Sequence, residues 1–204
     1  MESNYRLIAV KTFDSPAVIG ALLRMRPPVG NRVSGAVRGW VAAFPLQPED
    51  LEREAAQLSG ILSLPVIYVA NHADRFFSAL RYDRGELTDA VDSLAPAAGA
   101  PRRTGSPEQW RDLLPAGVAP SVLGESMAAH GRAVEQAAGP AATPAQPFLE
   151  DFLQVLGLPQ ALDGHALAAD PNCEMVEVRR YQTVPAYHPG LLQRLLGRSL
   201  AKKT

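Results

Sequence analysis

The sequence contains little cysteine, few aromatic residues and no long apolar run. Cys173 is the single cysteine among 204 residues, which excludes an internal disulfide and a zinc site built from several cysteines. No apolar run approaches the roughly 20 residues that a membrane-spanning helix needs. Residues 1–6 show neither the basic nor the apolar stretch of a signal peptide. We therefore expect a soluble cytoplasmic protein with no membrane partner.

The chain also lacks an excess of either charge. Lys and Arg together number 20 and Asp and Glu 21, which gives a formal net charge of -1 and a sequence pI near 6.4. Proteins that bind nucleic acids over a broad surface usually carry a clear basic excess. The balance of charge therefore argues against nucleic acid as a partner of the whole chain.

The motifs of common catalytic and cofactor sites are absent. There is no P-loop, and the chain after the first expected strand reads Asp-Ser-Pro-Ala at 14–17, which is not a dinucleotide-binding glycine pattern. Ser126 lacks the second glycine of a nucleophile elbow. His130, His165 and His188 stand singly, without the spacing of metal ligands. The sequence predicts no cofactor, no metal and no catalytic residue, and it favours a protein that is not an enzyme.

Apolar periodicity and helix-capping residues predict the secondary structure. Strands are expected at residues 5–13, 32–44, 65–70, 76–82, 87–92 and 174–181. In the second of these, Gly35 and Gly39 indicate a bend or a close backbone approach. Helices are expected at residues 15–25, 48–62, 106–114, 121–138, 148–156 and 191–200. These elements predict an α+β fold, with a mostly antiparallel or mixed β-sheet, flanking helices and a helical C-terminal region.

We expect one domain over residues 1–204. Its parts are a sheet-forming part at 1–93, a helical part with Pro/Ala-rich loops at 94–160, and a late strand with a basic terminal helix at 174–204. The late strand needs a sheet to join, and the other expected strands all lie before residue 93. The Pro/Ala-rich stretches at 94–105 and 139–147 are therefore interpreted as loops and not as domain boundaries.

The clearest local feature is a β-hairpin at residues 75–92. Two strands flank the turn Asp-Arg-Gly-Glu at 83–86, in which Gly85 can take the positive φ that a tight turn requires. The hairpin carries four acids, and the three at 86, 89 and 92 are three residues apart, which places successive ones on opposite faces. We interpret them as a solvated, charged hairpin edge and not as a cation site. The acids are Asp83, Glu86, Asp89 and Asp92.

Residues 39–93 resemble a family of uncharacterised bacterial proteins. The matching pieces are Gly-Trp-Val-Ala-Ala-Phe-Pro at 39–45, Pro-Val at 65–66, His-Ala-Asp-Arg-Phe at 72–76, and Arg-Tyr-Asp-Arg-Gly-Glu-Leu-Thr-Asp at 81–89. The family has three acids between His and Phe, whereas this chain has Ala73, Asp74 and Arg75. The resemblance implies a shared fold and carries no activity with it.

A polar group follows the third expected strand. His72, Asp74 and Arg75 are candidates for a small ligand-binding site, in which the His is a base or ligand and the Asp orients it. The alternative is a loop between strands, in which the side chains of Asn71 and Asp74 satisfy local backbone groups.

The C-terminal segment is basic. After Glu177 the chain has no acid and about six basic residues, the last of which are Arg194, Arg198, Lys202 and Lys203. These residues are candidates for contact with nucleic acid or an acidic partner. The alternative is a terminal helix whose cations complement its dipole and whose leucines pack on the body of the protein. These leucines are Leu191, Leu192, Leu195 and Leu196.

Three functional hypotheses follow from these features. The first is a non-enzymatic protein-interaction or regulatory module, either immunity-like or self-associating. Its partner is a protein, which is a second copy of the chain if the module forms a homo-oligomer. The alternative is a small enzyme or ligand-binding protein that uses the strand end at His72. The second alternative is nucleic-acid binding through the basic C-terminal segment.

Overall fold

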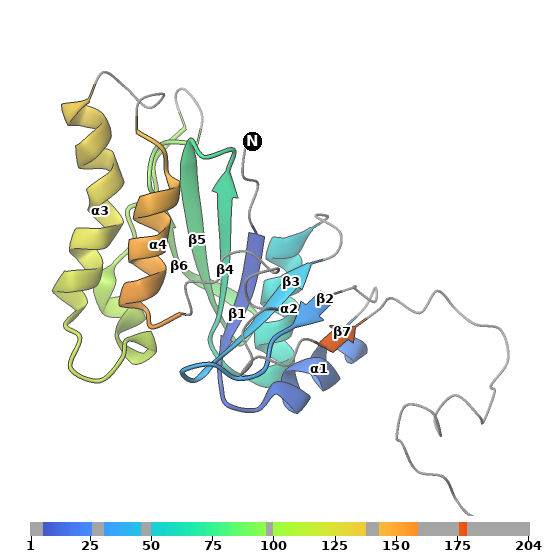
Figure 1. Ribbon diagram of the computed structural model, residues 1–204. Helices are drawn as coiled ribbons and strands as arrows, with labels where there is room; N and C mark the ends of the chain where they lie inside the picture. The colour runs from blue at the N-terminus through green and yellow to red at the C-terminus, as the bar shows by residue number, and fades with distance from the viewer. Residues whose placement is uncertain are drawn as a thin grey trace, which may run out of the picture.

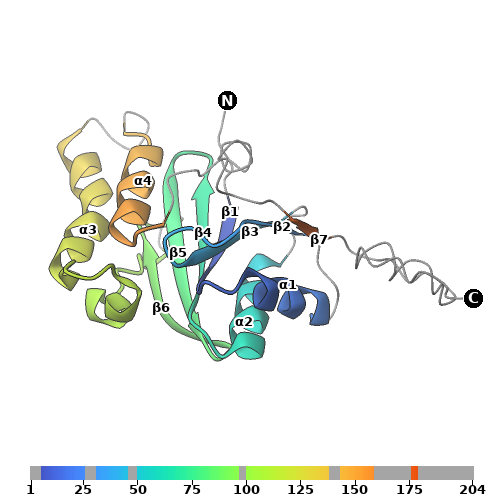
Figure 2. The same cartoon turned by 60° about the horizontal axis from the view of Figure 1, so that its bottom comes forward.

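The computed structural model describes residues 6–25, 31–45, 50–96, 100–137, 143–158 and 176–178. Within them, seven strands form one antiparallel sheet that lies between two layers of helices (Figures 1 and 2). The strands are β1 (Arg6–Lys11), β2 (Asn31–Val33), β3 (Trp40–Pro45), β4 (Val66–His72), β5 (Phe76–Asp83), β6 (Glu86–Asp92) and β7 (Val176–Val178). Their spatial order is β6-β5-β4-β1-β3-β2-β7, and each neighbouring pair is antiparallel. The predicted α+β fold class is confirmed.

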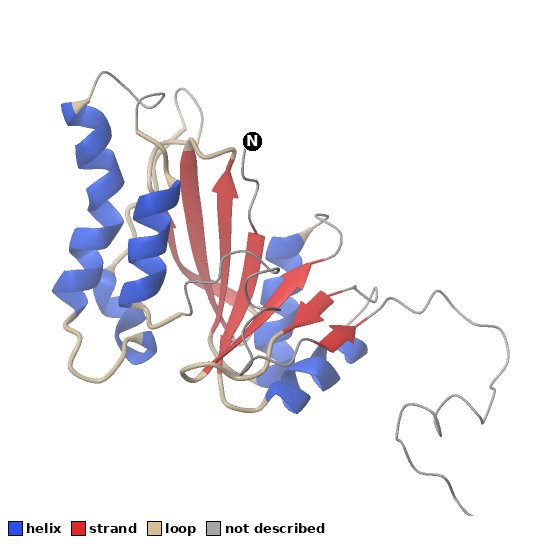
Figure 3. Ribbon diagram, viewed as in Figure 1, coloured by secondary structure: helices blue, strands red, loops and turns tan. Residues whose placement is uncertain are grey.

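Helices pack on both faces of this sheet (Figure 3). One layer contains α1 (Ser15–Arg24) and α2 (Leu51–Leu62), and the other contains the 3-10 helix η1 (Pro107–Leu113), α3 (Pro120–Gln136) and α4 (Gln146–Val155). In the second layer Trp110, Leu123, Met127 and Phe152 share a core with the sheet. This arrangement follows the sequence order, since the three helices described after residue 105 lie on one face.

Strand β1 lies in the middle of the sheet and is buried on both faces. Leu7 and Ala9 contribute to the core beneath α3 and α4, whereas Ile8 and Val10 contribute to the core beneath α1 and α2. Successive side chains of a strand point to opposite faces. A strand covered on both sides therefore reads as a continuous apolar run, which is why residues 5–13 predict a central strand.

The expected long strand at 32–44 is wrong. The chain instead forms a second hairpin, in which β2 and β3 are joined by a tight turn at Arg38 and Gly39. Val37 and Trp40 exchange backbone hydrogen bonds of 2.8 and 2.9 Å, and the two turn residues have φ of 52° and 77°. Positive φ at both central positions is the geometry that matches strand twist in two-residue hairpins, and glycine adopts it without a steric penalty.

Residues 100–105 lie against the outermost strand β6. Thr104 forms an isolated bridge with Val91, and the Asp92 N–H donates a hydrogen bond of 2.7 Å to the carbonyl of Arg103. Part of the predicted loop at 94–105 therefore covers a sheet edge, which is a position open to pairing with other chains when it is bare. The helix expected at 106–114 is a 3-10 helix, η1.

The late strand joins the sheet as expected. Residues Val176–Val178 form β7 and pair antiparallel with β2 at the edge opposite β6. The hairpin predicted at 75–92 is also confirmed, with a register shift between Arg81 and Tyr82. The terminal helix expected at 191–200 and the basic candidates Arg194, Arg198, Lys202 and Lys203 lie outside the described residues. Among the helices that are described, none combines the length and the apolar composition needed to cross a membrane.

Candidate functional site

The predicted strand-end residues occupy the turn between β4 and β5. His72 is the last residue of β4, and its carbonyl accepts a hydrogen bond of 3.1 Å from the Arg75 N–H. Ala73 and Asp74, between them, both have positive φ, 52° and 58°. This left-handed geometry is tolerated by Asp and is unfavourable for Ala.

Asp74 in this turn binds the N-terminus of α4. Its Oδ1 accepts a hydrogen bond of 2.7 Å from the Gln146 N–H, and its carbonyl accepts one of 2.9 Å from the Ala145 N–H. Asn71 supports the arrangement: its Oδ1 accepts from the Asp74 N–H at 3.1 Å, and its Nδ2 donates to Gln146 Oε1 at 2.8 Å. The two side chains thus satisfy backbone groups, as the loop interpretation expects, and one of these groups belongs to a distant helix.

The His72 ring makes a different contact. It is half-buried and stacks on Phe76, with ring centroids 4.3 Å apart and planes inclined by 12°. Burial, assisted by the nearby Arg6 cation, lowers the pKa of His72, so the neutral ring is favoured. In the described part of the chain, no contact joins this ring to the Asp74 carboxylate. The structure therefore does not assemble His72, Asp74 and Arg75 around one point, and a ligand site at these residues stays a prediction.

The interpretation of the hairpin acids as a solvated edge is wrong for Asp92. This side chain is 0% exposed, and its carboxylate receives the Arg103 guanidinium through Nε–Oδ2 and Nη2–Oδ1 contacts of 2.6 and 2.7 Å. Ser78 Oγ donates to Asp92 Oδ1 at 2.8 Å, and the Arg103 N–H donates to Oδ2 at 3.2 Å. The acid fastens the segment after β6 to the sheet, a role that its position in the sequence does not indicate.

Two further acids of the hairpin hold η1. Asp89 Oδ2 accepts hydrogen bonds from Trp110 Nε1 at 2.6 Å and from the Ser106 N–H at 2.8 Å. Asp83 pairs with Arg81 at 2.7 Å, and Arg81 in turn pairs with Asp112 of η1 at 2.6 Å. These carboxylates therefore bind partners within the fold. Across the described ranges, no group of three or more His, Cys, Asp or Glu side chains is placed to hold a metal ion.

A buried Ser–His pair lies between the sheet and α3. His130 Nδ1 is 2.9 Å from Ser93 Oγ, and His130 Nε2 is 3.1 Å from the carbonyl of Thr143. Because a carbonyl only accepts, Nε2 carries the proton and Nδ1 accepts from the serine hydroxyl, which itself accepts from the Phe77 N–H at 2.9 Å. A nucleophilic serine must reach a substrate. Both side chains are 0% exposed, so this pair links elements of the fold.

The pair could have been found from the helix periodicity. His130 follows Leu123 and Met127 at spacings of seven and three residues, which places it on the buried face of α3. Burial lowers the pKa of His130 and favours its neutral form. Glu54 has a similar signal, because it lies on the same face of α2 as Leu51 and Leu58.

Glu54 forms the second buried polar pair. Its carboxyl accepts a hydrogen bond of 2.5 Å from Asn31 Nδ2 on β2, and the two side chains are nearly inaccessible. Burial raises the pKa of Glu54, and this effect outweighs the hydrogen bond from Asn31. The pair attaches α2 to the sheet on the face opposite α3 and α4.

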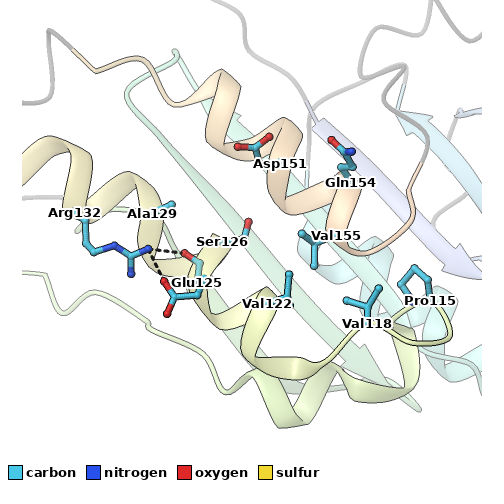
Figure 4. Close-up of a pocket in the computed structure, with 10 residues that line it drawn as sticks. All are labelled: Pro115, Val118, Val122, Glu125, Ser126, Ala129, Arg132, Asp151, Gln154 and Val155. Atoms are coloured by element: carbon cyan, nitrogen blue, oxygen red, sulfur yellow. Dashed lines mark hydrogen bonds and ion pairs between the residues drawn. The ribbon is translucent and has the colours of Figure 1, made fainter.

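The described residues contain a groove between α3, α4 and the turn that precedes α3 (Figure 4). Its volume is about 570 Å³. The apolar residues that line it are Pro115, Val118, Val122, Ala129 and Val155. The polar residues that line it are Glu125, Ser126, Arg132, Asp151 and Gln154.

The two walls of this α3–α4 groove differ in charge. On α3, Arg132 Nη2 pairs with Glu125 Oε2 at 2.8 Å, as the dashed lines in Figure 4 show. On α4, Asp151 is exposed, and no ion pair or hydrogen bond in the described part of the chain engages its carboxylate. Val122 is 48% exposed, which is high for a large apolar side chain. The groove is thus an open apolar surface with an available negative charge on one wall.

Sequence reasoning missed this groove, although a signal was present. Val122 and Ala129 are seven residues apart and so share one side of α3, and Val118 precedes the helix in the adjoining turn. Leu123 and Met127 occupy the neighbouring buried side. An apolar stripe wider than one packing face predicts a second contact surface.

Comparisons with protein-family models, with curated proteins and with solved structures find no match to this chain. The resemblance of residues 39–93 to a family of uncharacterised bacterial proteins therefore stays a prediction. The functional argument depends on the geometry of the described residues.

Proposed function

We propose that the chain is a non-enzymatic protein-interaction module whose contact surface is the α3–α4 groove. The observation that carries the proposal is the groove itself, a hollow of about 570 Å³ with five apolar residues in its lining. Its most exposed apolar side chain, Val122, remains 48% accessible. An apolar surface that is open between two helices fits a partner that covers it.

The position of the groove between two neighbouring helices favours a helical partner segment. Parallel or antiparallel helices pack with their axes about 8–10 Å apart, and a third helix can lie over the seam between two others. Amphipathic helices bind such seams with apolar side chains at spacings of three and four residues. The free carboxylate of Asp151 on the α4 wall would accept a basic residue from that segment.

The polar groups elsewhere support the same proposal. Asp74, Asp89, Asp92 and His130 each bind partners within the fold through backbone or side-chain hydrogen bonds. Catalytic acids, bases and nucleophiles need access to a substrate. These four ionisable side chains hold parts of the fold together, whereas the open surface of the groove is largely apolar.

A photo-reactive amino acid at position 122 tests the proposal in cells. The matched control carries the same group at position 61, because Ile61 is 37% exposed on α2, on the opposite face of the sheet. We expect a protein that crosslinks at position 122 and not at position 61. The captured protein is then purified, and its affinity is measured for Val122→Asp and Ile61→Asp variants whose folding is checked by circular dichroism.

The expected result is a loss of affinity of at least about tenfold for Val122→Asp and no loss for Ile61→Asp, because a charge in the apolar contact removes more than about 1.4 kcal/mol. Equal affinity of the two variants, or no crosslink at position 122, contradicts the proposal.

A further inference from the structure

We infer that the occupant of the α3–α4 groove is a segment of this same polypeptide, residues 191–200. The inference rests on the proposed function and names the segment that covers its contact surface. The segment belongs to the same molecule or to a second copy, and the test below distinguishes these two cases. Three properties of the chain support it: apolar pattern, charge and length.

The apolar pattern of the segment matches the groove. Leu191 and Leu195 are four residues apart, as are Leu192 and Leu196, so a helix over 191–200 places all four leucines on one stripe. The groove offers a stripe of complementary kind, formed by Val118 and Val122 of the α3 side and Val155 of α4 (Figure 4). Burial of such leucines contributes about 1.5–3 kcal/mol for each side chain that is fully covered.

The charges are complementary as well. Arg194 and Arg198 are four residues apart and flank the leucine stripe, and Lys202 and Lys203 follow. Asp151 on the α4 wall has no ion pair in the described part of the chain. On the opposite wall the Glu125 carboxylate is already paired with a cation. A basic flank laid along α4 therefore finds a free carboxylate, whereas an acidic segment would leave Asp151 facing a like charge.

The chain is long enough to place the segment there. From Val178, the end of β7, to Leu191 there are thirteen residue steps. At roughly 3.4 Å for each extended residue they span up to about 44 Å. The six inter-strand spacings from β7 to β6 amount to about 29 Å. The segment is thus long enough to reach the opposite edge of its own sheet at β6. The segment of a second copy is not limited by the length of this connection.

Disulfide trapping in the full chain tests the inference. In a Cys173→Ser background, Val122→Cys is combined with Leu195→Cys, and the control combines Ile61→Cys with Leu195→Cys. In a glutathione redox buffer we expect the groove pair to form its disulfide at least about tenfold faster than the control pair, because binding raises the effective concentration of the two thiols. A crosslinked monomer on a non-reducing gel assigns the segment to the same molecule, and a crosslinked dimer assigns it to a second copy.

A charge reversal tests the electrostatic part. Asp151→Lys in the trapping background should slow the crosslink about two- to fivefold, which corresponds to one surface ion pair. The control is Glu86→Lys, an exposed acid at the tip of the β5–β6 hairpin. Equal trapping rates for the groove pair and the Ile61 pair overturn the inference.

The outcome separates this inference from the proposed function. If trapping fails while a purified partner still needs Val122, the inference is wrong and the groove binds another protein. If trapping fails and no partner depends on Val122, both are wrong. If trapping fails and the full chain binds DNA with an affinity that falls steeply with salt, the basic residues are assigned to contact with nucleic acid.

Discussion

Replacing Asp92 by Asn should destabilise the protein by about 3 kcal/mol at neutral pH. The substitution keeps the size of the side chain but removes its charge and turns one acceptor oxygen into a donor NH₂. Arg103 and Ser78 still direct hydrogen-bond donors at residue 92, but the amide offers one acceptor oxygen where the carboxylate offered two. Breaking a buried ion pair by removing one partner costs about 3–5 kcal/mol. Because Arg103 is 40% exposed and can turn toward water, the lower end of this range applies.

The same substitution should have a smaller effect at low pH. Burial alone would raise the pKa of Asp92, but the hydrogen bonds from Arg103 and Ser78 outweigh it and hold the pKa below its ordinary value of 3.8. A group whose pKa is lower in the folded state stabilises the fold fully above its unfolded pKa. That contribution disappears as the pH falls below 3.8 and through the folded value. The protonated acid then resembles the amide.

Urea unfolding at pH 7, 5 and 3 measures both effects. The control is Glu108→Gln, because Glu108 pairs with Arg111 on the surface, and such a pair contributes at most about 1 kcal/mol. We expect the gap between wild type and Asp92→Asn to be large at pH 7 and 5 and to narrow at pH 3. A variant as stable as Glu108→Gln at pH 7, or a gap that does not change with pH, refutes the assigned role of Asp92.

Three further predictions test other contacts. Wild-type stability should fall as the pH drops below about 6.5, because burial lowers the pKa of His130 beneath that value. His130→Phe should make the melting temperature less dependent on pH between pH 8 and 5. At pH 8 it should lower the free energy of unfolding by about 2 kcal/mol, because Ser93 and Thr143 lose their hydrogen-bond partner. Asp74→Ala should cost about 1 kcal/mol in urea unfolding through the lost helix cap, and Arg75→Ala less than about 0.5 kcal/mol. Gly39→Ala and Gly117→Ala should each cost about 1–2 kcal/mol in the same assay, because both glycines have positive φ and the added Cβ at 39 meets only the ring of Phe13, which is 81% exposed and can turn aside.

The predictable parts of the fold have local causes. The turn at 83–86 contains a glycine at the position of positive φ, so the β5–β6 hairpin follows from a few adjacent residues. The turn at 38–39 has the same chemistry, with φ of 77° at Gly39. The sequence predicts only a bend there, because most flanking residues are apolar, which is also the pattern of one long buried strand. Here local chemistry and apolar pattern pointed to different structures, and the turn decided the outcome.

The candidate site depends on distant residues. Asp92 could be recognised as an acid on a strand, but the Arg103 that encloses it comes from a segment of loop composition. Asp74 could be recognised as a turn residue, whereas its bond to Gln146 joins positions that are 72 apart in the sequence. The groove arises only when α3 and α4 are side by side, so a single helix shows its apolar stripe and not its partner.

The contact between Asp74 and Gln146 has a consequence for the order of folding. α4 has no side-chain cap of its own, since the residue before it is Ala145. Its capping acceptor is supplied by a turn that is synthesised 72 residues earlier. On the ribosome, the β4–β5 turn therefore leaves the exit tunnel before the helix that needs it. In a circular permutant that places α4 ahead of this turn, α4 would instead leave the tunnel before its capping acceptor.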